Sequence, residues 1–223
     1  YGLNIPAREI SGDFYDFYPH DDQIYFNLSD VSGKGVNAGM VMAKAITLFK
    51  IFAKQKFKPN EILLEMNNDL KETNPPGTFI TSIVGSYNLK TDIVEMSNAG
   101  HQPAILSKGD NFTEFPSSST PLAVIKQKNS DAYKLETFKL DGGRVYCFTD
   151  GFSECLDDNK KEIGIEGVKK LIKNHKNSSL KTELKNATEE IRQKSLKKDY
   201  KEKGIKENID ILDDDLTIIG IGK

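Results

Sequence analysis

Hydrophobic and polar residues alternate along several short segments of the chain, which indicates β-strands. Ile24, Phe26 and Leu28 alternate with Gln23, Tyr25 and Asn27, a period of two that predicts a strand with one buried face. Residues 78–89 and 92–106 predict two further strands joined by a turn at residues 90–92. The segment 144–149 is apolar on both faces, as in a buried sandwich strand, and 216–223 predicts a closing strand.

Helical spacing of apolar residues marks three other stretches. Residues 37–55 predict a helix capped by Asn37, Pro59 opens a second helix, and residues 163–207 are largely helical in pattern. The side chains expected in the core are Val41, Ala45, Leu48 and Phe52, then Ile62, Leu63, Met66 and Leu70, then Val168, Leu171, Leu184 and Ile191, with Met40 and Met42 also interpreted as core packing. Strands in hairpins with helices grouped between them favour an α+β fold.

Composition narrows the class of protein. A length of 223 residues suits one domain over 1–223, and 29% charged residues with a net charge of -2 give no electrostatic case for nucleic acid. Two cysteines, Cys147 and Cys155, are too few for a disulfide framework and favour a cytoplasmic setting. No apolar run reaches the roughly eighteen residues of a membrane helix, so we expect no direct membrane contact. Because the chain begins at Tyr1, we expect the C-terminal part of a longer protein.

Four acidic clusters lie within or just beside apolar strand patterns. Aspartate is a poor strand residue, so each cluster alone is most simply a turn or strand-end Asp. Together, buried carboxylates would repel one another and would need a cation or protons, and oxygen ligands alone favour Mg²⁺ or Mn²⁺ over zinc. Spacing does not place these loops together, so their convergence is a prediction. The clusters are SGDFYD (Asp13, Asp16), SDVSG (Asp30), FTDG (Asp150) and LDDDLT (Asp213 to Asp215).

Five ordered motifs carry a resemblance to a known family. AREISGDFYDF, SDVSGKG, NAGHQPAIL, FTDGFSE and DDDLTIIGI, spread over almost the whole chain, resemble the metal-dependent (PPM-type) serine/threonine protein phosphatases, and within them the bacterial SpoIIE/RsbU branch. The resemblance implies an α-β-β-α sandwich of two antiparallel sheets. It also implies a site for two Mn²⁺ or Mg²⁺ ions, or three, at one edge of the sandwich.

The resemblance also implies which residues form that site. Asp13, Asp30, Asp150 and Asp214 would be the catalytic, metal-binding carboxylates, and the carbonyl of Val31 would complete one coordination shell. Asp213 and Asp215 are the neighbouring alternatives to Asp214. Arg8, five residues before Asp13, is the candidate for binding the substrate phosphate, since a guanidinium fits paired phosphate oxygens; the alternative is a surface Arg on an edge strand.

By the same resemblance, the chain hydrolyses phosphoserine or phosphothreonine on a protein by attack of a metal-bridging water. The expected substrate is an anti-anti-sigma regulator of the STAS type in a partner-switching pathway. An upstream sensor domain would belong to the full-length chain, and a homodimer is compatible with the sequence. Residues 37–73 occupy the place of two helices that are a regulatory element in the branch.

Several residues keep more than one interpretation. Ser32 stands where many eukaryotic-type relatives carry a His, so no His proton donor is expected there and leaving-group protonation would fall to a metal-bound water. His101 is more simply a structural His at a strand end than an acid or base. Asp16 either orients a metal-bound water or pairs with a neighbouring donor, and Lys34 either approaches a phosphate or is solvated. Residues 194–207 are interpreted as a solvated helical face.

Two other functions compete with the phosphatase hypothesis. The same fold could serve as a non-catalytic module that binds a partner or senses a ligand, although all four carboxylates are present. A nucleotide-dependent enzyme built on SGKG fails on spacing, because a Walker loop needs a Gly, four residues and then Gly-Lys-Ser/Thr. In this chain Gly33 is followed directly by Lys34 and Gly35.

Overall fold

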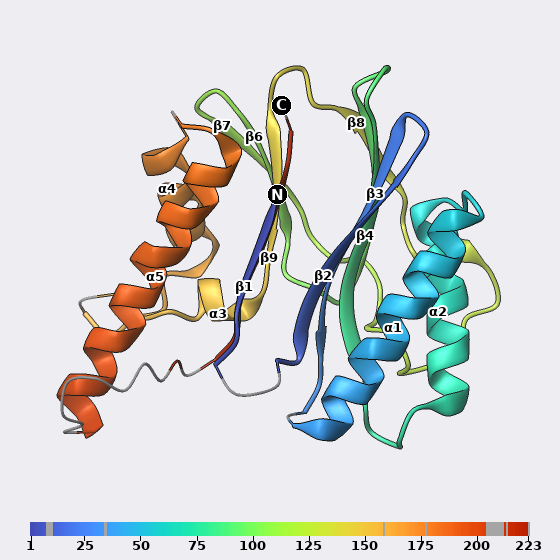
Figure 1. The fold of residues 1–223 in the computed structure, drawn as a ribbon, viewed down its shortest axis with the longest axis horizontal. Helices are drawn as coiled ribbons and strands as arrows, with labels where there is room; N and C mark the ends of the chain where they lie inside the picture. The colour runs from blue at the N-terminus through green and yellow to red at the C-terminus, as the bar shows by residue number, and fades with distance from the viewer. Residues whose placement is uncertain are drawn as a thin grey trace.

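Two β-sheets pack face to face, and helices cover the outer face of each (Figure 1). The computed structural model describes residues 1–7, 11–33, 35–157, 159–176, 178–203, 212 and 214–222, with the backbone alone at 196–203. This arrangement confirms the α+β class and the four-layer sandwich expected from the sequence.

Both sheets have five strands, and every neighbouring pair is antiparallel. Sheet A, in spatial order, consists of β1 (Gly2–Ile5), β10 (Leu216–Ile221), β9 (Arg144–Phe148), β6 (Ala104–Lys108) and β7 (Asn111–Phe115). Sheet B consists of β2 (Asp13–His20), β3 (Gln23–Val31), β4 (Ile80–Asn88), β5 (Ile93–Ala99) and β8 (Glu136–Lys139).

The helices divide between the two outer faces. Helices α1 (Val36–Lys54) and α2 (Pro59–Thr73) lie on sheet B, whereas α4 (Gly164–His175) and α5 (Leu180–Lys203) cover sheet A (Figure 1). The short α3 (Asp150–Ser153) follows β9, and a 3₁₀ turn (Ser130–Ala132) precedes β8. Asn37 is not the cap expected from the sequence, because α1 begins at Val36 and Gly35 precedes it. Part of the predicted helical stretch, residues 204–207, lies outside the described residues.

Three hydrophobic cores separate the four layers, and β3 takes part in two of them. Phe26 and Leu28 pack between the sheets, while Tyr25 and Val31 on the opposite face pack beneath α1 and α2. The expected strand with one buried face is therefore wrong, because the helices cover the face that alternation assigned to solvent. The buried strand β9 was predicted correctly: Val145 and Cys147 face the core between the sheets, and Tyr146 and Phe148 face α4 and α5.

The expected single strand at 92–106 is divided between the two sheets. β5 ends at Ala99 in sheet B, and β6 begins at Ala104 in sheet A. Gly100 has φ +70°, and a Cβ there would lie 2.5 Å from a Pro121 ring atom, so a side chain is disfavoured on both grounds. The chain thus leaves one sheet at Gly100 and enters the other, which uniform apolar character along the segment does not reveal.

Helix α1 carries apolar side chains on its solvent-exposed face as well as on the face that packs against sheet B. Val41 and Ala45 are buried as expected, and Phe49 is fully buried as well, whereas Leu48 and Phe52 are only partly buried. Met40, expected in the core, is 69% exposed, whereas Met66 of α2 is fully buried. By length and composition α1 could cross a membrane, which the sequence analysis did not anticipate. Its buried face packs on sheet B as a core helix does.

A buried ionic cluster joins α5 to sheet A. The Glu183 carboxylate is fully buried, pairs with the Arg144 guanidinium and accepts a 2.7 Å hydrogen bond from the Tyr146 hydroxyl. Arg144 also donates to the Ser178 carbonyl that precedes α5. Both partners of Glu183 lie on β9, so this carboxylate fixes where α5 sits on the sheet.

Glu183→Ala is expected to lower the free energy of unfolding by about 3 kcal/mol, because it leaves the Arg144 charge and the Tyr146 hydroxyl without their buried partner. Urea unfolding measures the loss. Glu166→Ala is the control, since the Glu166 side chain is 83% exposed in its pair with Lys169 and should cost less than about 0.5 kcal/mol. Equal losses in the two variants would contradict this role.

Candidate active site

Four strand ends bring the predicted carboxylates to one end of the sandwich. Asp13 is the first residue of β2 and pairs in register with Asp30 near the end of β3. Asp150 lies two residues after the end of β9, and Asp214 lies two residues before the start of β10. The Thr149 N–H donates to the Thr217 carbonyl at 3.0 Å, which holds the β9 and β10 ends side by side. Strand pairing therefore brings together the two Asp residues of each sheet, and the hydrogen bond from the Thr149 hydroxyl to Asp13 joins the two sheets at this end.

Asp13 is the most deeply buried of the four. Burial raises the pKa of Asp13 to about 8; the Thr149 hydroxyl, 2.6 Å from Oδ2, opposes this rise, and the nearby charge of Asp30 adds to it. The fold therefore disfavours the ionised form of Asp13. The Thr149 side chain ties this carboxyl, on sheet B, to the end of β9 in sheet A.

Asp30 and Asp150 are shifted in the same direction. Burial raises the pKa of Asp30 to about 6, the charges of Asp150 and Asp214 add to the rise, and a hydrogen bond with Asp13 opposes it. Burial also raises the pKa of Asp150, with the charge of Asp214 as the next cause. Each of these carboxyls is thus close enough to feel another's charge, and within the described part of the chain none forms an ion pair with a Lys or Arg.

The donor chemistry of this cluster fits a hard divalent cation. Its side-chain ligands would be carboxylate oxygens alone, and buried like charges of this kind are stabilised by Mg²⁺ or Mn²⁺. Among the described residues, however, no group of three or more acidic, His or Cys side chains has the spacing to hold a metal ion in the present arrangement.

Asp214 and Asp215 have different roles, although they are adjacent. The Asp215 carboxylate accepts hydrogen bonds from the Ala7 N–H at 2.7 Å, the Ser11 hydroxyl at 2.7 Å and the Gly12 N–H at 2.9 Å. Asp214 is exposed, and from the described residues it accepts one bond, from the Asp215 N–H. Asp215 therefore anchors the segment before β2, whereas the role of Asp214 as a metal ligand stays a prediction. Asp213 lies outside the described residues.

Gly12 allows the Val31 carbonyl and the Asp30 carboxylate to approach the start of β2. A Cβ at Gly12 would lie 3.0 Å from the Val31 carbonyl oxygen and 3.3 Å from Asp30 Oδ1. The Val31 N–H also donates to the Gly12 carbonyl at 3.2 Å. The two predicted ligands of β3 thus lie on the same side of this glycine, which a larger residue would crowd.

Sequence reasoning gave no role to Thr149 or Gly151 at this end of the sandwich, and it named Asp215 only as an alternative metal ligand. Thr149 and Asp215 make the contacts just described, and Gly151 allows close approach, since a Cβ there would lie 2.2 Å from the Asp215 carbonyl oxygen. The only signal in the sequence is position: Thr149 is a polar residue at the end of an otherwise apolar strand.

The structure gives defined contacts to three residues outside the carboxylate set: His101, Asp16 and Ser32. His101 is buried and bridges the Thr81 hydroxyl (2.7 Å from Nδ1) to the Phe148 carbonyl (3.1 Å from Nε2), so it joins the two sheets. Asp16 lies on the opposite face of β2 from Asp13 and pairs with Lys50 of α1 at 2.9 Å, as the second interpretation expected. Ser32 accepts a bond from the Phe79 N–H at 2.8 Å. Arg8 and Lys34 lie outside the described residues.

The comparisons with known proteins decide the family. A sequence profile described as Stage II sporulation protein E (SpoIIE) matches residues 20–221. The chain belongs to the SpoIIE family. It is a PP2C-type phosphatase domain, related to the RsbU and SpoIIE phosphatases.

Individual relatives of this SpoIIE-family domain are distant. Phosphoserine phosphatase RsbU of Bacillus subtilis (strain 168) is 24% identical over 184 residues, which make up 82% of this chain and 55% of RsbU. The chain thus spans about half the length of RsbU. The SiaA-PP2C domain of Pseudomonas aeruginosa has a TM-score of 0.80 at 18% identity, covering 100% of this chain and 84% of that one. RsbX, solved in complex with magnesium, has a TM-score of 0.69 at 18% identity, covering 99% of this chain and 91% of the RsbX chain. These structures show a PP2C-like fold.

A cavity of about 330 Å³ adjoins the candidate site of this SpoIIE-family domain, and Asp214, Glu154 and Glu162 are among the residues that line it. Burial raises the pKa of Glu154, and the charges of Asp150 and Glu162 add to the rise. The wall beside Asp214 is therefore acidic.

Asp30→Asn is expected to raise the free energy of unfolding of the metal-free protein by about 1–3 kcal/mol at pH 7.5. A raised folded pKa means that the fold disfavours the ionised form, and this cost is present above the folded pKa of about 6. Urea unfolding in EDTA measures it. Asp16→Asn is the matched control, since it removes a favourable pair with Lys50 and should not stabilise. A less stable Asp30→Asn protein would contradict repulsion at the site.

A second expectation concerns pH. Burial lowers the pKa of His101 to about 4 from its ordinary 6.5, so the neutral ring stabilises the fold above pH 6.5 and this contribution is lost as the pH falls toward 4. Between pH 7 and pH 5 the loss should be about 2 kcal/mol. It is measured as the extra pH dependence of urea unfolding in the native protein compared with His101→Gln, in which the titrating group is absent. Identical pH profiles would exclude a buried neutral His101.

Proposed function

We propose that this SpoIIE-family domain is a metal-dependent protein phosphatase that hydrolyses phosphoserine or phosphothreonine on a protein. The observation that carries the proposal is the set of carboxyls at one end of the sandwich, where burial first and neighbouring carboxylate charges second raise the pKa values of Asp13, Asp30 and Asp150. Family membership supports the reaction class, and the magnesium in RsbX supports the cofactor class.

Each proposed ligand has a defined contribution from this chain. Asp13, Asp30, Asp150 and Asp214 would hold two Mn²⁺ or Mg²⁺ ions, with the Val31 carbonyl as an additional oxygen ligand. When bound, these ions supply a water nucleophile at neutral pH and neutralise the charge of the phosphoryl oxygens. Thr149 orients Asp13, and Asp215 holds the segment before β2 in place. Bound cations would favour the ionised forms of Asp13 and Asp30, which burial disfavours in the metal-free protein.

The substrate and setting are proposed from the relatives. RsbU is named a phosphoserine phosphatase, and we propose a phosphorylated STAS-type anti-anti-sigma regulator as the substrate of this domain in a partner-switching pathway. Because the chain covers only 55% of RsbU, we propose that a sensor domain precedes it in the full-length protein. A cytoplasmic location agrees with two buried cysteine thiols that form no disulfide.

Phosphate release from a phosphoserine STAS protein tests this function. Activity should require Mn²⁺ or Mg²⁺, stop in EDTA, and fall at least about 100-fold in Asp30→Asn and in Asp150→Asn, since removing a ligand should cost more than disturbing the groups around it.

Asp16→Asn is again the matched control, because Asp16 lies three residues from Asp13 on the other face of the same strand and should leave turnover near the native rate. Turnover that survives chelation and both ligand substitutions would refute the proposal. A protein that binds the phosphoprotein tightly but releases no phosphate with either metal would instead be a non-catalytic binding module on the same fold.

A further inference from the structure

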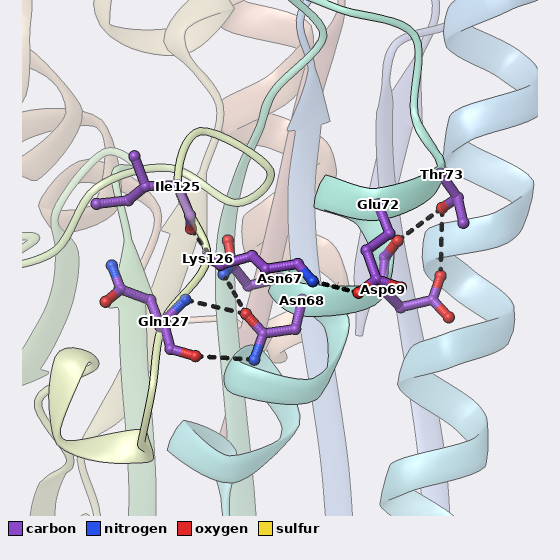
Figure 2. Close-up of polar contacts among 8 residues, drawn as sticks. All are labelled: Asn67, Asn68, Asp69, Glu72, Thr73, Ile125, Lys126 and Gln127. Atoms are coloured by element: carbon purple, nitrogen blue, oxygen red, sulfur yellow. Dashed lines mark hydrogen bonds and ion pairs between the residues drawn. The ribbon is translucent and has the colours of Figure 1, made fainter.

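Two consecutive asparagines of α2 hold the segment 122–127 through its backbone (Figure 2). Asn67 accepts a hydrogen bond from the Ala123 N–H at 2.9 Å and donates to the Ile125 carbonyl at 2.9 Å. Asn68 donates to the Gln127 carbonyl at 2.9 Å and accepts from the Gln127 N–H at 3.0 Å. The two side chains therefore make four bonds to three residues of one segment, and Asn67 is fully buried while doing so.

The backbone of this segment is held in an unfavourable conformation. Ala123 has φ +67°, in the left-handed region that residues with a Cβ rarely adopt. Its N–H is the one that Asn67 binds, so the asparagine helps to maintain this conformation. Strain of this kind persists only where the surrounding contacts enforce it.

From Leu122 the contacts continue to the end of β3. Leu122 exchanges two backbone hydrogen bonds with Ile80, of 2.8 and 3.1 Å, and Ile80 pairs in register with Val31. One residue further on, the Ser32 N–H donates to the Phe79 carbonyl at 2.9 Å. An unbroken run of hydrogen-bonded neighbours thus links α2 to the strand end that carries Asp30 and Val31.

We propose that Asn67 and Asn68 are positioning residues for the candidate active site. By fixing segment 122–127 on α2, they hold the start of β4, and through it the Val31–Ser32 end of β3, in the position from which Asp30 and the Val31 carbonyl bind metal. This role rests on the proposed function, but its mechanical part, the link from α2 to Ser32, can be measured without metal or substrate.

Hydrogen exchange of the Val31 and Ser32 amides measures that link in the metal-free protein. Neither amide contacts Asn67, Asn68 or segment 122–127, since their acceptors are the carbonyls of Gly12 and Phe79. In Asn67→Ala, and in Asn68→Ala as a milder variant at a half-buried position, both amides should exchange about tenfold faster. Mn²⁺ binding, titrated by calorimetry with the metal alone, should weaken by about tenfold.

Asn60→Ala is the matched control. Asn60 is also an α2 asparagine that donates to a backbone carbonyl, that of Ser130 in the 3₁₀ turn at 3.5 Å, but Ser130 makes no direct backbone hydrogen bond to Leu122 or Ile80. This variant should keep native exchange at Val31 and Ser32 and native Mn²⁺ affinity.

The proposal is overturned if Asn67→Ala and Asn68→Ala speed exchange only within α2 and 122–127 while Ser32 exchange and Mn²⁺ affinity stay native. That result would make the asparagines a local support of the segment. A native protein that binds Mn²⁺ but releases no phosphate refutes the proposed function and leaves the positioning role to be judged on exchange and affinity. If the native protein binds no Mn²⁺, the exchange rates at Val31 and Ser32 decide alone.

Discussion

Repulsion between carboxylates at one end of a closed sandwich is the constraint around which this structure is built. Asp13, Asp30 and Asp150 are drawn from three different strand ends into a site where burial and mutual charge raise their pKa values. An apolar core alone would exclude such groups. They are kept in place by contacts that are themselves specific: Thr149 on Asp13, three donors on Asp215, and glycines where the chain segments approach most closely. These contacts thus hold carboxylates in positions where burial disfavours their charge, as expected for a site that binds a cation.

The sequence predicts much of this because the site is built at strand ends. An Asp that interrupts an apolar strand is visible in the sequence, and all four predicted carboxylates lie at such positions. The choice of Asp214 over Asp215 was made from the family motif, and the hydrogen bonds of Asp215 now give a physical reason for it. The roles of the four as metal ligands stay a prediction, as does the role of Arg8.

Features that depend on tertiary contacts were not predictable in the same way. The passage from β5 to β6 is a change of sheet at Gly100, and apolar character alone cannot distinguish it from a continuous strand. The short strands β7 and β8 lie at sheet edges and bury little, so their patterns are weak. Asn67 and Asn68 are ordinary polar residues of an amphipathic helix until the partner segment, more than fifty residues away, is seen beside them. Met40 was expected in the core but is exposed, because an apolar residue need not be buried.

The pairing of β9 with β10 has a consequence for how the domain is assembled. Asp13 and Asp30 come together in a hairpin of near neighbours, which can form quickly, whereas Thr149 and Thr217 are 68 residues apart and their strands meet only after the intervening helices are placed. The chain can therefore complete sheet B before Asp150 and Asp214 arrive. Non-local closure of the β9–β10 pair then adds the charges of Asp150 and Asp214 to the Asp13–Asp30 pair that is already formed, so the ionic conditions of refolding should act on this late step more than on collapse of the first sheet.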